Sequence, residues 1–156
     1  MTDFLNDLRL SNAPTDPNFL PEGKYPAFIS DLSIKDVPAK PPRPAGKALI
    51  ITYKVTPLDL ENQGKEKTEF KSLPRVPVTL ENGDTNPEAD ADDKKNAAYL
   101  KQRLLSLGVP ENELDSLKKE DLLGTPVWIQ MVQSGTYYNV RNVELREETE
   151  GFSGQL

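Results

Sequence analysis

The sequence predicts a mainly β domain in which five strands, with a helix between the third and the fourth, close into a small barrel. Five segments carry the apolar and polar alternation of strands, and a single segment carries a clear helical stripe. The chain has 156 residues, of which 36% are hydrophobic, enough for one sizeable core but hardly for two. We therefore expect one domain with short extensions at both ends.

The N-terminal region predicts an arm followed by the first strand. Phe4, Leu5 and Leu8 have helical spacing, so residues 1–9 are expected to form a short docking helix, and a proline-rich connector follows. Pro21-Glu22-Gly23 is a turn signal, after which the first strand is predicted over Lys24 to Ile34. We assign residues 1–20 to the arm.

The next two strands follow a proline-rich loop. Residues 37–47 contain four prolines, which favour an extended, polyproline-like backbone. The second strand is predicted over Ala48 to Val55, with Leu49, Ile51, Tyr53 and Val55 sharing one face. Asn62-Gln63-Gly64 indicates a turn into the third strand, Glu66 to Leu73, which Pro74 ends.

The helix is the best-defined element of the sequence. Asp92 or Asp93 is a suitable N-cap, and Gly108 followed by Pro110 provides a C-terminal stop. Between them lies one apolar stripe, formed by Ala97, Leu100, Leu104 and Leu107. This helix is expected to plug the core, and a second short helical turn is predicted over Glu111 to Leu117.

The last two strands complete the pattern. In the fourth, Val127, Ile129 and Met131 share one face and Trp128 lies on the other; Ser134-Gly135 then makes a tight turn. The fifth is predicted over Tyr137 to Leu145, with Val140 and Val143 out of phase as at a bulge. Three strands, a helix and two strands is the order of a five-stranded OB-type Greek-key barrel. We assign residues 21–146 to this domain and 147–156 to an acidic C-terminal tail.

Four segments resemble a known group of proteins: residues 19–27, 94–109, 122–127 and 137–143. They are similar to small bacteriophage proteins that resemble phage single-stranded DNA-binding proteins of the OB type. The resemblance covers roughly residues 19–145 and consists of structural punctuation. It implies an OB fold and a role in phage DNA replication or recombination, within the cytoplasm of the host cell.

The composition excludes several kinds of chemistry. The chain has no cysteine and no histidine, which rules out disulfides, thiol catalysis and an imidazole proton shuttle, and no zinc site is expected. Gly46-Lys47 lacks the rest of a phosphate-binding loop, and a helix start explains Asp90, Asp92 and Asp93 better than a metal ion does. No apolar run is long enough to span a membrane, and no signal peptide is recognisable. We expect a soluble cytoplasmic protein with no cofactor and no enzymatic activity.

The charges are unevenly distributed along the chain. The net charge is −6, which argues at first against a nucleic-acid partner. Residues 35–75, however, contain nine basic and five acidic residues, whereas residues 81–93 contain six carboxylates and no base. This segregation suits a modestly basic face with acidic flanks, although an ordinary solvated surface gives the same counts.

The candidate nucleic-acid-binding residues are aromatic side chains and nearby cations, because bases stack on rings and lysines follow the phosphates. Trp128 is either a stacking platform or a lid over the core, Phe70 is either exposed or in the core, and Tyr53 is expected in the core. Tyr137 with Arg141 is the expected surface pair. The full predicted set is Trp128, Tyr137, Arg141, Phe70, Lys71, Arg75, Lys47 and Lys54.

The tail suggests a second interaction. Glu147, Glu148, Glu150 and Phe152 resemble the acidic, aromatic-bearing tails through which many single-stranded DNA-binding proteins recruit replication or recombination partners; plain disorder explains them equally well. The alternative function is a phage structural or assembly protein that contacts other subunits, including copies of itself, through its terminal arms.

Overall fold

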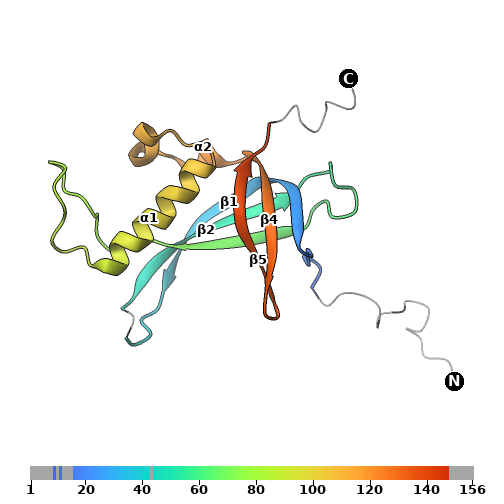
Figure 1. Ribbon diagram of the computed structural model, residues 1–156, viewed down its shortest axis with the longest axis horizontal. Coiled ribbons are helices and arrows are strands. Elements are labelled where there is room, and N and C mark those ends of the chain that lie inside the picture. Colours follow the sequence, from blue (N-terminus) through green and yellow to red (C-terminus); the bar gives the residue numbers. More distant parts are fainter. Residues whose placement is uncertain (1–8, 10, 12–15, 43, 148–156) are drawn as a thin grey trace.

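The computed structural model describes residues 9, 11, 16–42 and 44–147 and is mainly β. Five antiparallel strands form one open sheet in the order β3-β2-β1-β4-β5 (Figure 1). The strands are β1 (Gly23–Val37), β2 (Gly46–Val55), β3 (Glu66–Ser72), β4 (Pro126–Ser134) and β5 (Tyr137–Leu145). The helices are α1 (Ala91–Ser106), the 3₁₀ helix η3 (Glu111–Ser116) and the single turn α2 (Lys119–Leu122).

β1 is the central strand, and it pairs with two neighbouring strands along different parts of its length. It pairs with β4 from Gly23 to Phe28 and with β2 from Ala27 to Val37. The β1–β2 register shifts between Ile29 and Asp31, so Ser30 is an extra residue on β1. A bulge of this kind bends the strand and increases its twist, which lets one long strand curve from one partner to the next.

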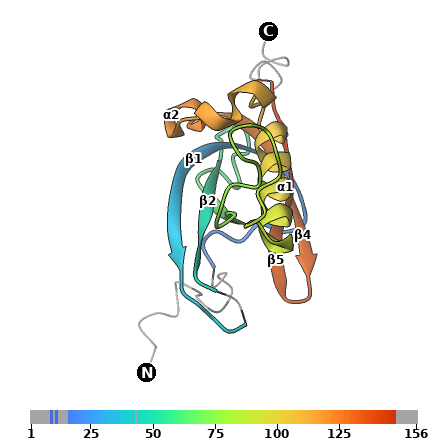
Figure 2. The ribbon, with the colours of Figure 1, turned by 90° about the vertical axis from the view of Figure 1, so that its left-hand side faces the viewer.

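The core lies on the inner face of the curved sheet. Ile51, Tyr53 and Val55 from β2 are buried, as the alternation of that strand predicts. Val127, Ile129 and Met131 from β4 are buried in the same way. α1 packs across one end of the sheet with Leu104 and Leu107 in the core, and η3 and α2 follow its C-terminal end (Figures 1 and 2).

Some boundaries differ from those predicted. β1 extends to Val37 and β2 begins at Gly46, because these two residues pair with each other. The N-cap of α1 is Asp90, so the prediction of Asp92 or Asp93 was wrong. Asp93 is instead the third residue of a capping box: Asp90 Oδ1 accepts from the Asp93 N–H at 2.8 Å, and the Asp90 N–H donates to Asp93 Oδ2 at 3.3 Å. The predicted bulge in β5 is confirmed, with the register shift at Arg141.

A buried network of charged and polar side chains joins four elements. Glu69 of β3 accepts from the Tyr53 hydroxyl of β2 at 2.9 Å and from Arg103 Nη2 of α1 at 2.7 Å. The same Arg103 nitrogen lies 3.4 Å from the carbonyl oxygen of Arg141 on β5. Burial, and then the Glu69 carboxylate, raise the pKa of Tyr53, which keeps its hydroxyl protonated as a donor. The network therefore holds the two edge strands of the sheet against α1.

Residues 16–20 close the gap between β3 and β5. Leu20 is fully buried, and the Phe19 ring meets Tyr138 of β5 edge-on with the ring centroids 4.9 Å apart. Asn18 Oδ1 accepts from the Glu66 N–H of β3 at 3.0 Å, and Lys65 Nζ donates to the Phe19 carbonyl at 2.9 Å. This end of the N-terminal arm is thus packed into the domain, while the predicted docking helix, apart from Arg9, lies outside the described residues.

Removing one partner of the buried ion pair tests this network. We expect Arg103→Ala to lower the free energy of unfolding by about 3–5 kcal/mol, because Glu69 would remain buried without its cation. The double variant Glu69→Gln/Arg103→Met should recover most of that loss, since Gln still accepts from Tyr53 and no charge is buried. Urea unfolding of the three proteins measures both effects. A parent-like midpoint for Arg103→Ala would contradict the role given to the pair.

The capping box predicts a pH-dependent difference. The Asp93 backbone N–H, and then the Arg75 guanidinium, lower the pKa of Asp90 in the folded protein. Asp90 therefore stabilises the fold above its unfolded-state pKa, and this contribution is lost as the pH falls through the lower folded-state value. Asp90→Ala should melt below the parent at about pH 7, and the gap should close at about pH 2. Thermal unfolding at both pH values measures this, and an equal gap at both would contradict it.

Candidate nucleic-acid interface

The outer faces of β1, β2 and β3 form one continuous surface, because side chains alternate between the faces of a strand. The register aligns this surface in rows. Ser33, Ile50 and Phe70 form one row, and Phe28, Lys54 and Glu66 form another. Thr52 and Thr68 lie between them on β2 and β3. We refer to these eight residues as the outer-face patch.

Phe70 is the most exposed aromatic side chain of this patch. It is 60% exposed, as the alternation of β3 requires, because its neighbour Glu69 is buried on the inner face. Its cross-strand neighbour Ile50 is only partly buried and widens the apolar area. An exposed ring beside an aliphatic side chain on a flat strand surface is suited to stacking against a nucleobase. Of the two predicted placements of Phe70, the surface placement is therefore the one observed.

The cations near the patch are of two kinds. Lys54 on the patch, Lys35 beside it on β1 and the exposed Lys47 form no ion pair with any residue in the described part of the chain. Lys71 lies 3.4 Å from Glu69 with a largely buried side chain. Of these four lysines, only Lys71 has its charge compensated within the protein.

Arg75 binds to the start of α1. Its backbone N–H donates to Asp93 Oδ1 at 2.9 Å, and its guanidinium contacts both Asp90 and Asp93. The Asp90 carboxylate is the main cause that raises the pKa of the Arg75 guanidinium. Arg75 was predicted from sequence to contact nucleic acid; in the structure it anchors the loop after β3 to the helix.

Trp128 lies on the outer face of β4, opposite the buried side chains of Val127 and Ile129. It is partly buried, and it is paired across the sheet with Pro26 of β1 and Glu144 of β5. Phe28, the neighbour of Pro126 in the same register, brings a second partly buried ring to this side. Phe28 was not selected from sequence, although the alternation of β1 places it opposite Ile29, which is buried.

Tyr137 and Arg141 are both exposed, Tyr137 by 73%. Tyr137 begins β5 directly after the two-residue turn that connects it to β4. Tyr138 points to the other face and contacts Phe19, because neighbouring side chains of a strand alternate between its faces. Arg141 sits at the bulge, so its position relative to Tyr137 differs from that of a regular strand.

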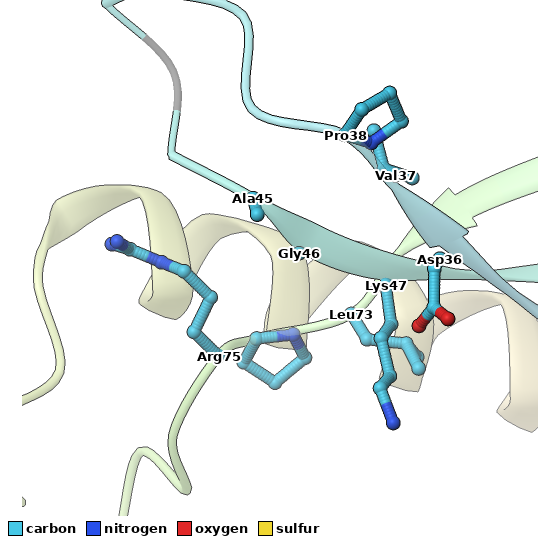
Figure 3. A pocket seen from close by; sticks show the side chains of 9 residues that line it. Asp36, Val37, Pro38, Ala45, Gly46, Lys47, Leu73 and Arg75 are labelled. Carbon is cyan, nitrogen blue, oxygen red and sulfur yellow. The ribbon is translucent and has the colours of Figure 1, made fainter.

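An open pocket of about 790 Å³ lies at the far end of the β1–β2 hairpin (Figure 3). Its walls come from the hairpin tip and from the segment after β3, which includes Leu73, Pro74 and Arg75. Asp36 and Lys47 face each other across the two strands, and their side chains point in the same direction (Figure 3). Lys47 therefore offers its ammonium group at this pocket and not on the outer-face patch.

Within residues 16–42 and 44–147, no cluster of carboxylates has the arrangement of a metal site, and no helix is long and apolar enough to cross a membrane. Glu147 is exposed, whereas Glu148, Glu150 and Phe152 lie outside the described residues.

No protein-family model matches this sequence, and no curated protein is significantly similar to it.

Proposed function

We propose that the protein binds single-stranded DNA on the outer-face patch of an OB-type barrel. The strand order β3-β2-β1-β4-β5, with α1 between β3 and β4, supports the OB assignment. Arg103 further supports closure of the barrel, because it reaches both β3 and β5. In OB folds the second and third strands, with the loops after the first and fourth strands, bind oligonucleotides. Phe70 lies on the third of these strands, and Tyr137 lies beside the loop after the fourth.

Exposed Phe70 is the observation that carries the proposal. A base stacks on its ring and on the adjoining Ile50 side chain, while the hydroxyl groups of Thr52 and Thr68 lie beside it as hydrogen-bonding groups. Lys54 lies on the same face, two rows of cross-strand pairs away from Phe70, and it contacts a phosphate of the bound DNA. Stacking is tolerant of sequence, so this surface binds single strands with little base preference. Duplex DNA has no unstacked bases to offer and binds less well.

The net charge of −6 is compatible with this function because of where the cations lie. Lys35, Lys47 and Lys54 all belong to the β1–β2 hairpin and are not paired with acidic groups in the described residues. Asp90, Asp92 and Asp93 lie at the start of α1, where Asp90 and Asp93 contact Arg75 and not these lysines. The hairpin thus carries a local positive charge, although the net charge of the whole chain is negative.

A titration at several salt concentrations tests the proposed function. A labelled oligonucleotide should bind more tightly as a single strand than as a duplex, and Trp128, the only tryptophan, provides a second fluorescence signal. With about two to four phosphates neutralised, log K should fall against log salt with a slope of about −1.4 to −2.8. If no oligonucleotide binds at low salt, the proposal fails and the alternative, a phage structural or assembly protein, is favoured.

A substitution of Phe70 tests the site itself. Phe70→Ala should weaken binding to single strands by about 5-fold to 150-fold, the range that loss of one stacked base gives. The melting temperature should change little, because the ring is mostly in solvent. Tyr99→Ala is the matched control, since Tyr99 is 51% exposed on α1 and away from the patch, and it should leave the affinity unchanged. Equal losses in the two variants would exclude Phe70 as a specific contact.

A further inference from the structure

One side of β1 is an open sheet edge. β4 pairs with β1 only as far as Phe28, and beyond it Ile29 makes backbone hydrogen bonds with Gly124 and Thr125. From Asp31 to Val37, β1 has only β2 as a neighbour in the described sheet. In Figure 2 this part of β1 forms the left-hand border of the molecule. Such an edge is a template for pairing with another strand.

The register identifies the backbone groups that are available on this edge. The Val55 N–H donates to Lys65 and the Lys47 carbonyl accepts from Leu73, so odd-numbered residues of β2 direct their backbone groups away from β1. Even-numbered β2 residues then bond to their partners on β1, which are Asp31, Ser33 and Lys35. It follows that Leu32, Ile34 and Asp36 direct their N–H and C=O groups to the open edge.

The side chains along this edge are accessible and include a large apolar group. Residues 33–37 are all exposed. Ile34 is 64% exposed, although the alternation of β1 directs its side chain to the inner face of the sheet. Edge strands are commonly protected by charges of one sign, which repel a second copy. Here the charges have opposite signs and equal spacing, with Asp31 two residues before Ser33 and Lys35 two residues after it.

We infer that this edge pairs with the same edge of a second copy of the chain, antiparallel and with Ser33 opposite Ser33. Leu32 then exchanges backbone hydrogen bonds with Ile34 of the second copy, and the Ile34 side chain, which is 64% exposed in the single chain, loses part of its contact with water. Asp31 lies opposite Lys35 of the second copy, and the reverse pair forms by symmetry. Asp31 already contacts Lys119 of α2 at 3.0 Å, and both groups remain half in solvent, so the carboxylate can meet a second cation.

The pairing has a consequence for the outer-face patch. Residues directly opposite each other in antiparallel strands project to the same face, so the two-fold axis is perpendicular to the sheet. Both copies of Phe70 then lie on the same side of the dimer. The inference does not depend on DNA binding, and its test contains no nucleic acid.

Charge reversal at two positions tests the pairing. Lys35→Glu places Glu opposite Asp31 of the second copy, and Asp31→Lys places Lys opposite Lys35; each should weaken dimerisation by about tenfold or more. An equimolar mixture of the two variants should dimerise as well as the parent, because each chain then meets opposite charges. Lys94→Glu, the same charge change on the exposed face of α1, is the control and should leave the dimer unchanged. Sedimentation velocity over a range of protein concentrations gives the association state.

Each result decides the matter. Circular dichroism first establishes that the variants fold, which their exposed positions favour. A parent protein that stays monomeric at every concentration overturns the inference. A parent dimer that Lys35→Glu and Asp31→Lys leave intact places the interface elsewhere and also overturns it. A parent that dimerises, single variants that do not, and a mixture that does so again support this edge and this register.

Discussion

The buried ion pair between Glu69 and Arg103 is the constraint that fixes α1 against both edge strands of the sheet. Two charges in a core lose their hydration, and only close contacts compensate for that loss. Arg103 therefore has to stay within reach of Glu69 on one edge strand, and from there it also meets the Arg141 carbonyl on the other. Tyr53 fixes the remaining carboxylate oxygen from the neighbouring strand. A purely apolar contact would tolerate sliding of α1 along the sheet, whereas this set of directional bonds permits one position.

The length of β1 accounts for both surfaces that we consider functional. A strand of 15 residues is too long for one straight partner in so small a sheet, and the extra residue Ser30 bends it midway. Its first half is covered on both sides, which makes it the centre of the domain. Its second half projects with β2 beyond β4, and there it presents one side of the outer-face patch as well as an edge without a neighbour. The open edge and part of the proposed binding face thus both belong to one projecting hairpin.

The sequence predicts the elements well because each has its own periodicity, and it predicts the site less well because the site depends on pairing. Alternation alone placed Val127 inside and Trp128 outside, and the stripe of α1 identified Leu104 and Leu107. Arg103 lies beside that stripe, but nothing in the local sequence indicates that it forms a buried ion pair with Glu69 of β3. Similarly, Lys71, Arg75 and Lys47 look equivalent in a list of cations. Only the three-dimensional structure shows that Lys71 contacts Glu69, that Arg75 contacts the cap of α1, and that Lys47 lines the pocket.

The short segment that closes the gap between β3 and β5 imposes an order on folding during synthesis. Phe19 and Leu20 leave the ribosome before any strand, yet Phe19 packs on Tyr138, which is among the last parts of the domain to be made. β1, β2 and β3 can pair as soon as they emerge, since their contacts are local. The edge of β1 that pairs with β4 stays without a partner until the chain is nearly finished. The nascent domain therefore exposes its central strand for most of its synthesis, the period in which such edges are most prone to misassembly.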